Sequence, residues 1–303
     1  MGPAGWSYAD WEGIVYPHNK PRGFHEAGYL AQFFDTIEIN TSFYYPLRAD
    51  LANVWIQKVE HNQSFKFTAK LWRRFTHERN ANRQDEKVFK RGLAPLVAAG
   101  RLGALLLQFP WSFKNTPENH EYLSGLFVQF MEYSLVLEVR HSSWNRPEVF
   151  EWLADRGVGI CNIDQPVIGR SIPPSDRATT AVGYVRLHGR NYEHWFTSNE
   201  HPEERYNYLY SPSELESWVE RIRSLAQRTD VSYVITNNHY QGKAIANALQ
   251  LISLLRNQPV RVPENLREHY PELENIATPE GVPPAPKQTD LGFETSTAGK
   301  KNN

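Results

Sequence analysis

The sequence has few cysteines, no excess of charge of either sign and no long hydrophobic run. Its 303 residues contain a single cysteine, Cys161, which excludes an intramolecular disulfide framework and a multi-cysteine zinc site. The 33 basic and 34 acidic residues leave a formal net charge of −1. The chain is therefore not a polycation that would adhere to nucleic acid or membranes over its whole surface, and any such binding needs a local patch.

The most apolar stretch, residues 93–111, is broken by Arg101 and falls far short of a segment that spans a lipid bilayer. The first six residues have neither the basic nor the apolar region of a secretory signal. Together with the lone cysteine, these features favour a cytoplasmic protein without a membrane partner. With 40% hydrophobic residues the chain can still bury a sizeable core, so we expect a globular protein.

Short β-rich runs alternate with segments of helical periodicity over residues 1–257, and this pattern predicts βαβ units with parallel pairing. The expected strands are Gly2–Trp6, Thr36–Asn40, Phe65–Ala69, Ala104–Phe109, Ser134–Val139, Gly159–Asp164, Val182–His188 and Ser232–Asn237. Eight such units in this length fit a closed (β/α)8 TIM-type barrel better than the alternative, an open doubly wound sheet. No glycine motif of a nucleotide-binding open sheet is present.

The expected helices carry apolar stripes. One contains Leu51, Val54, Trp55 and Val59, and another begins after the start signal at residues 211–214.

Two segments depart from the regular alternation. Residues 165–180 contain Pro166, Pro173 and Pro174, so we expect no ordinary helix after the sixth strand. Residues 258–303 hold seven of the 20 prolines and no tryptophan, which predicts a proline-rich, largely disordered tail outside a barrel domain of residues 1–257. The alternative for this segment is that residues 260–270 dock on the barrel.

Polar residues close most of the predicted strands, and in a barrel the carboxyl ends of the strands form the site. The candidate catalytic residues are Glu38, Glu138, Asp164 and His188. The candidates for binding a substrate or an anion are Lys70, Arg140, His141, Arg186, Arg190, Asn40, Asn237, Trp6, Tyr8 and Tyr44.

Carboxylates, a histidine and guanidinium groups at one barrel mouth are suited to holding an anionic group and to acid/base chemistry. In this interpretation the three carboxylates are acid/base candidates and His188 is a proton shuttle. The glycine after His188 would allow a ligand to approach the backbone. The alternative is a structural ring of ion pairs with no ligand. No cofactor or metal is predicted, because the sequence has no paired-histidine motif and arginines would repel a cation. A divalent metal on the carboxylates and His188 is the weaker alternative.

Residues 66–91 form a local basic segment, with nine Lys and Arg against three acidic residues. The segment contains Arg73, Arg74, His77 and Arg79, with the aromatic residues Trp72 and Phe75 interleaved. Such a segment is typical of phosphate or single-stranded nucleic-acid binding, although a solvated charged surface has the same pattern. It raises a second hypothesis, a nucleic-acid-binding module without catalysis. A third hypothesis is a partner-binding scaffold whose polar strand ends are structural.

Aromatic residues gather in three loops that would surround the same mouth, at residues 6–11, 43–45 and 192–196. They provide stacking area for a sugar or a base, or alternatively they cap the core.

Several strings together resemble one known family. They are Gly5-Trp6-Ser7-Tyr8, Glu38-Ile39-Asn40-Thr41-Ser42-Phe43-Tyr44, Gln108-Phe109-Pro110, Glu138-Val139-Arg140-His141-Ser142-Ser143-Trp144, Arg186-Leu187-His188-Gly189-Arg190, Tyr206-Asn207-Tyr208-Leu209-Tyr210 and Asn237-Asn238-His239. As a set, over about residues 2–256, they resemble the YecE-like family, domain of unknown function 72. The resemblance implies a TIM-type barrel and no particular reaction. The polar residues at the strand ends, rather than the resemblance, give the leading hypothesis, an anion-binding barrel that acts as a hydrolase or lyase on a phosphorylated or sugar-like substrate.

Overall fold

Eight parallel strands form one sheet in a computed structural model that describes residues 1–193, 195 and 202–278. The strands are β1 (Gly2–Pro3), β2 (Thr36–Ile39), β3 (Lys66–Lys70), β4 (Leu102–Gln108), β5 (Leu135–Glu138), β6 (Gly159–Asp164), β7 (Val182–Leu187) and β8 (Val231–Thr236). They pair in the order β1-β8-β7-β6-β5-β4-β3-β2, and a parallel bridge between Ala4 and Glu38 joins the two ends. The predicted TIM-type barrel is confirmed.

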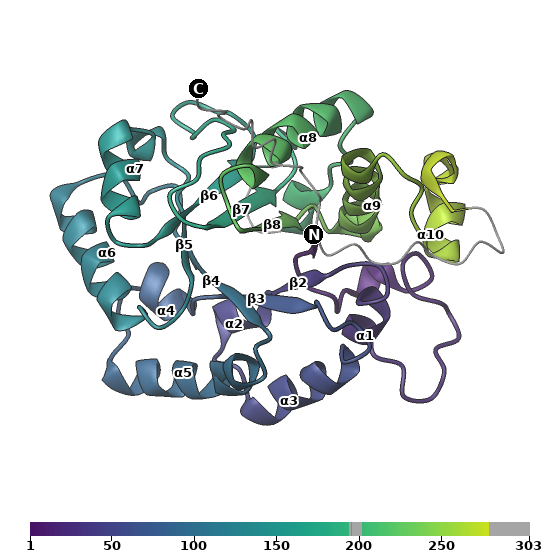
Figure 1. Cartoon of the computed structure of the whole chain (residues 1–303), viewed down its shortest axis with the longest axis horizontal. Coiled ribbons are helices and arrows are strands. Elements are labelled where there is room, and N and C mark those ends of the chain that lie inside the picture. The colour runs from purple at the N-terminus through teal and green to yellow at the C-terminus, as the bar shows by residue number, and fades with distance from the viewer. Residues whose placement is uncertain (194, 196–201, 279–303) are drawn as a thin grey trace, which may run out of the picture.

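Helices surround this sheet on its outer side (Figure 1). They are α1 (Glu26–Leu30), α2 (Thr41–Tyr44), α3 (Ala49–Lys58), α4 (Arg73–Thr76), α5 (Arg83–Ala98), α6 (Pro117–Gln129), α7 (Pro147–Ala154), α8 (Pro212–Ala226), α9 (Lys243–Arg256) and α10 (Glu264–His269). The start signal of α8 is a capping box, in which Ser211 and Glu214 bond each other's backbone. The short 3₁₀ turns are η1 (Ala9–Trp11), η2 (Ser142–Trp144), η3 (Pro202–Tyr206), η4 (Tyr240–Gly242) and η5 (Pro271–Ile276).

The predicted apolar stripe of α3 was partly wrong. Trp55 and Val59 are buried as expected, but Leu51 and Val54 are 42% and 39% exposed, and Ala52 is buried instead. The helix α3 packs against α5 as well as the barrel. Its buried face therefore includes the small residue Ala52, which allows the two helices to approach closely.

The connection from β6 to β7 contains no helix, as its prolines predicted. Asn162, on β6, organises it. Its side-chain oxygen accepts hydrogen bonds from the Ser175 hydroxyl and the Arg177 backbone N–H, both at 2.7 Å, and its amide nitrogen donates to the Arg177 carbonyl at 2.9 Å. One side chain thus takes over backbone partners that a helix would have supplied.

The prediction of a disordered tail from residue 258 was wrong for residues 258–278. This segment forms α10 and η5, and a β-bridge joins Val260 to Ala277. Leu266 and Leu273 are fully buried in the barrel core cluster, so the docking alternative describes this segment (Figure 1). Leu266, Tyr270 and Leu273, spaced four and three residues apart, form the buried face of this segment despite its prolines. The rest of the predicted tail, 279–303, lies outside the described residues.

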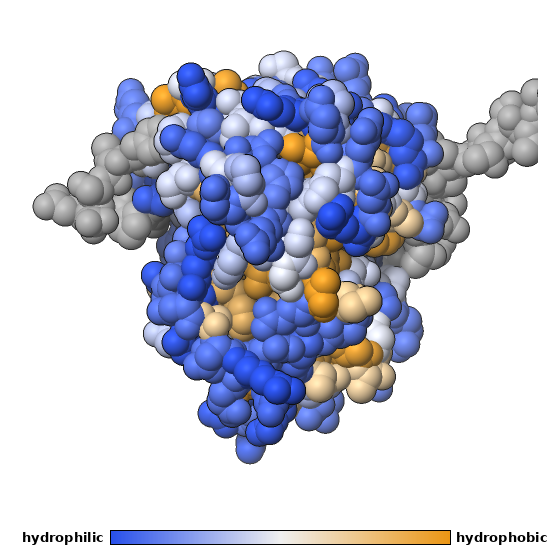
Figure 2. All heavy atoms as spheres, turned by 90° about the vertical axis from the view of Figure 1, so that its left-hand side faces the viewer, coloured by the Kyte–Doolittle hydropathy of each residue, from blue (hydrophilic) through white to orange (hydrophobic). Residues whose placement is uncertain are grey.

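Figure 2 shows one side of the molecule, where the surface is largely hydrophilic and hydrophobic residues form smaller areas between the polar ones. Among the helices of the described part of the chain, none is long and apolar enough to cross a membrane.

Candidate functional site

A buried cluster of charged side chains fills the barrel below its mouth, at the carboxyl ends of the strands. Arg186 of β7 is its centre and is completely buried, as are Glu38 of β2 and Glu138 of β5. One terminal nitrogen of Arg186 bonds Glu38 Oε1 at 2.7 Å, and the other bonds Glu138 Oε2 at 2.6 Å. A single guanidinium therefore bridges two carboxylates from different strands, a geometry that its planar fork allows.

Lys70 and Arg140 join the cluster from the side of the mouth. Lys70 Nζ lies 3.2 Å from Glu38 Oε1, and Arg140 Nη2 lies 2.9 Å from Glu138 Oε1. Both side chains keep some exposure, 11% and 16%, so they form the boundary between the cluster and solvent.

Neighbouring cations keep both carboxylates of the cluster ionised. Burial alone would raise the pKa of Glu38, but the charges of Arg186 and Lys70 outweigh it and hold this pKa below its ordinary value. For Glu138, burial is again opposed, mainly by the charge of Arg186, with Arg140 and the hydrogen bond from His188 adding to it, and its pKa lies well below the ordinary value. Neither group carries a proton at neutral pH that it could donate as an acid.

His188 is neutral and completely enclosed. Its Nε2 lies 3.2 Å from Glu138 Oε1, and its Nδ1 lies 3.0 Å from the Asn237 amide nitrogen. The tautomer with the proton on Nε2 satisfies both contacts, since Asn237 then donates to Nδ1. Burial, reinforced by Arg140, lowers the pKa of His188 to about 3. The predicted His188 thus joins the cluster, while Gly189 serves packing rather than a ligand, because a Cβ there would lie 2.8 Å from Tyr208 Cβ.

A cavity of about 690 Å³ opens above the cluster, and cations dominate its charged lining. Lys70 and Arg140 form part of its floor, and Arg73 and Arg205 lie on its wall. Among the described residues that line it, there is no aspartate or glutamate. The side chain of Arg205 has a buried Nε with no hydrogen-bond partner among the described residues. This arrangement is suited to a ligand that carries negative charge.

Aromatic rings make up much of the remaining wall, as predicted for Trp6, Tyr8 and Tyr44. Trp6 packs edge-on against Trp55 at 4.9 Å between ring centroids, and Tyr8 stacks on His239 at 4.3 Å. The predicted Asn40 also lines the cavity and donates a hydrogen bond to the Tyr8 hydroxyl at 2.8 Å. Flat rings beside cations suit a ligand that has both a ring and an anionic group.

The other aromatic loops contribute less to the cavity. Tyr45 and Tyr192 are 75% and 55% exposed, whereas Trp195 is buried, with its ring 5.7 Å from the Arg140 guanidinium. Phe196 lies outside the described residues.

Asp164 and Arg190 do not reach the cluster. Asp164 accepts two hydrogen bonds from Arg190, both at 2.8 Å, and one from Trp218 Nε1 of α8 at 2.5 Å. In the register of β6 and β7, Asp164 pairs with Leu187, while Ile163 pairs with Arg186. Because paired residues of neighbouring strands share a face, Asp164 lies on the helix-facing side of the sheet.

His141 is not among the residues that line the cavity. Its Nδ1 accepts a hydrogen bond from the Ser143 backbone N–H at 3.1 Å and so caps the turn η2. Its ring packs edge-on against Trp111 at 5.0 Å. His141, which was predicted to bind a ligand, therefore stabilises a turn instead.

The basic segment 66–91 divides between two surroundings. Arg73 and His77 line the cavity, and burial lowers the pKa of His77 to about 4. Arg73 is paired with Glu78 at 2.9 Å. Arg74 does not line the cavity and is paired with Asp85 at 2.8 Å, and Arg79 lies 4.2 Å from the ring centroid of Tyr122. The basic residues thus do not form one continuous free surface.

Several residues of the site were not among the predicted ones. Tyr184 donates from its hydroxyl to Glu38 Oε2 at 2.9 Å, and Gln108 accepts from Arg186 at 3.2 Å. Tyr184 stands two residues before Arg186 in the sequence, so the alternation along β7 carried a signal for it. Arg205, Tyr206 and His239 also line the cavity, but they come from loops in which no periodicity indicates direction.

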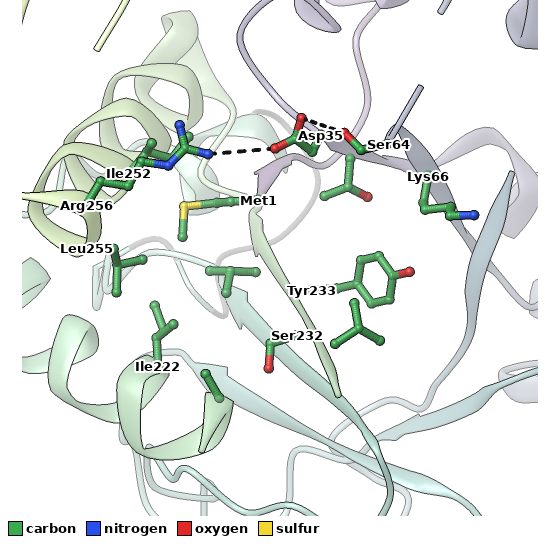
Figure 3. Close-up of a pocket in the computed structure, with 14 residues that line it drawn as sticks. Met1, Asp35, Ser64, Lys66, Ile222, Ser232, Tyr233, Ile252, Leu255 and Arg256 are labelled. Carbon is green, nitrogen blue, oxygen red and sulfur yellow. Dashed lines mark hydrogen bonds and ion pairs between the residues drawn. The ribbon is translucent and has the colours of Figure 1, made fainter. Parts of the chain in front are cut away.

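A second, smaller cavity of about 290 Å³ lies at the amino ends of the strands (Figure 3). Aliphatic side chains of α8, α9 and β8 form much of its lining, and Asp35 and Arg256 lie at one edge, 3.9 Å apart. The amino ends of barrel strands usually serve stability rather than chemistry, so the mouth remains the candidate site. In the part of the chain that the structure describes, no group of three or more His, Cys, Asp or Glu could hold a metal ion.

The fold and the site define a TIM-type barrel with a cationic, ring-lined cavity over a buried ion-pair cluster. The chain belongs to the family described as "Protein of unknown function DUF72", which matches residues 1–271.

Three relatives agree with this membership. The UPF0759 protein YunF of Bacillus subtilis is 30% identical over 270 residues, which cover 84% of this chain and 94% of that protein. A crystal structure of a DUF72 family protein from Thermotoga maritima is 34% identical, with a TM-score of 0.72, over 84% of this chain and 97% of that one. A DUF72 family protein from Enterococcus faecalis, 23% identical, has the same fold, with a TM-score of 0.74 over 87% and 97% of the two chains.

Proposed function

We propose that this protein binds a small phosphorylated or otherwise anionic, sugar-like ligand at the barrel mouth and acts on it as a lyase. One observation carries the proposal: four cationic side chains and no described carboxylate line the cavity. The aromatic lining supports the sugar-like part of the ligand, since sugars and bases stack on flat rings.

The buried carboxylates support a positioning role and weigh against a glycosidase mechanism. Glu38 and Glu138 are completely buried and ionised, and their carboxylate oxygens bind arginine nitrogens at 2.6–2.9 Å. A glycosidase-type mechanism needs one protonated carboxylic acid and one carboxylate that reaches water or substrate. Here the two groups hold Lys70 and Arg140 toward the cavity instead.

Nucleic-acid binding is the second candidate, and Arg73 and Tyr44 favour it. These side chains are 44% and 53% exposed respectively, and both line the cavity close to the surface. Of the four residues that the basic segment suggested, Arg74 and Arg79 are engaged with neighbouring helices. We therefore rank this candidate below a small ligand.

The test is binding of glucose 6-phosphate and inorganic phosphate, measured by calorimetry, in the protein and a double variant Arg73→Gln/Arg205→Gln. We expect binding in the parent protein and a loss of at least about tenfold in the variant, because two charged hydrogen-bond donors are removed. The matched control is Arg74→Gln/Arg79→Gln, which removes the same charge outside the cavity and should bind as the parent does.

Glucose without phosphate should bind much more weakly than glucose 6-phosphate. Equal loss in both double variants would contradict the proposal, because charge alone rather than the cavity would then decide binding. Salt-sensitive binding of a single-stranded oligonucleotide, in the absence of phosphate binding, would favour the second candidate.

A further inference from the structure

Lys70 holds a particular place in the cavity. It is the last residue of β3, its backbone N–H donates to the Ser42 hydroxyl at 2.9 Å, and its side chain reaches the cavity floor. Because the strand and this hydrogen bond hold the backbone of Lys70 in place, its side chain extends into the cavity from a rigid position.

The cluster does not need the charge of Lys70 for its balance. Glu38 Oε1 already accepts Arg186 Nη2 at 2.7 Å, which is closer than Lys70 Nζ at 3.2 Å, and Glu38 Oε2 accepts the Tyr184 hydroxyl. With Lys70 neutral, two carboxylates face the two guanidiniums of Arg186 and Arg140. No buried carboxylate would then lack a partner, so the amine can lose its proton without breaking the cluster.

The surroundings also favour the neutral amine. Burial and the charge of Arg186 lower the pKa of Lys70 to about 8, against the opposing effect of Glu38 and Glu138. At pH values near 8 a substantial fraction of Lys70 is therefore a free amine, the form that attacks carbonyl carbon.

We propose that Lys70 is a catalytic nucleophile that forms a Schiff base with an aldehyde or ketone group of the anionic ligand. This inference rests on the proposed function and names its substrate class, a carbonyl compound that carries phosphate or carboxylate. The anionic group lies against Arg73, Arg140 and Arg205, and the carbonyl group lies toward the cavity floor.

The reaction balances without a further co-reactant. The nitrogen lone pair forms the bond to the carbonyl carbon, and the carbonyl oxygen leaves as one water with the two amine protons. The imine then takes back from solvent the proton that the ammonium group had released, and the resulting positive charge lies beside Glu38, where the ammonium charge was. An iminium accepts the electron pair of a carbon–carbon bond that breaks at the carbon next to it, which leaves an enamine, and this is the step that a lyase of this kind needs.

The test is reductive trapping with pyridoxal phosphate, a phosphorylated aromatic aldehyde, and sodium borohydride, followed by peptide mass mapping. We expect the adduct on Lys70 to form at least about tenfold faster than on the average lysine, because fewer of the others are deprotonated. The rate should rise with pH through about 8. Lys70→Arg, which keeps a positive charge beside Glu38, should lose this adduct.

Lys66→Arg is the matched control, since Lys66 lies at the other end of the same strand and should leave the adduct unchanged. Adducts spread evenly over the lysines, with glucose 6-phosphate binding intact, would overturn the Schiff-base inference alone. A Lys70 adduct that forms equally fast with pyridoxal, which lacks the phosphate, would uphold the nucleophile and contradict the anion site.

Discussion

Lys70 shows how a residue that serves a site can oppose folding. Its pKa is lowered from 10.5 to about 8 in the folded protein, so the folded state binds the proton less tightly than the unfolded state. Below pH 8 both states hold the proton, and folding carries the full cost of burying the charge. Between pH 8 and 10.5 the folded state loses the proton first, and stability rises with pH as the cost is relieved.

Lys70→Met should therefore stabilise the protein at pH 7 by roughly 1 to 3 kcal/mol, because the variant buries an apolar side chain of similar length in place of a cation. The measurement is urea unfolding at pH 7 and again at pH 9.5. We expect the advantage of the variant to shrink at the higher pH.

Lys66→Met is the comparison, and it should show no gain of this kind. A Lys70→Met protein that is less stable than the parent at both pH values would mean that the ammonium group supports the cluster. That result would also weaken the argument for a free amine in the site.

Because side chains alternate between the two faces of a strand, a shift of one residue decides whether a carboxylate points into the barrel or toward the helices. Glu38 and Glu138 point into the barrel, while Asp164 points toward α8 and holds Arg190 and Trp218 there. The alternation of Arg186 and Leu187 along β7 is visible in the sequence, but the register that pairs Leu187 with Asp164 is known only from the structure. The register itself is not visible in a single sequence, and so Asp164 was grouped with the wrong face.

Asp164→Asn should lower the stability by about 2 to 4 kcal/mol, because it removes the charge from an ion pair in which the carboxylate is fully buried. Urea unfolding measures this loss. Glucose 6-phosphate binding should be unchanged, since Asp164 does not line the cavity. If binding were lost while stability stayed the same, Asp164 would belong to the site after all.

The elements of this fold were predictable to a large extent, because each strand is a short β-rich run followed by a turn. The bounds of β6 matched the prediction, and the absence of a helix after it followed from its prolines. Lys70 and Arg140 were predicted for the cavity that they line, since they lie at or just beyond strand ends. Arg186 was predicted to bind the ligand, but it is completely buried in the ion-pair cluster and does not line the cavity. Arg205 and Tyr206 were not predicted, because a long loop carries them back to the mouth and no local pattern encodes that path.

In the molecule as a whole, the C-terminal segment 258–278 contacts the loops that follow β1 and β8, beside the mouth. The Asn265 amide of α10 donates to the Gly13 carbonyl at 3.2 Å, and the Tyr270 hydroxyl donates to the Gln241 carbonyl at 2.7 Å. The two loops that receive these bonds carry Tyr8 and His239, whose stacked rings line the cavity. The segment 258–278 thus supports the cavity wall from behind.

Leu266→Ala and Leu273→Ala should each destabilise the protein by about 2 to 5 kcal/mol, because both leucines are completely buried between this segment and the barrel. Each should also weaken glucose 6-phosphate binding, as the loops behind Tyr8 and His239 lose their support. Chemical unfolding and calorimetry measure the two effects. Leu51→Ala, at a leucine that is 42% exposed, is the control and should change neither. A stability loss with full retention of binding would show that the segment completes the core without shaping the cavity, and the wall would then depend on the loops alone.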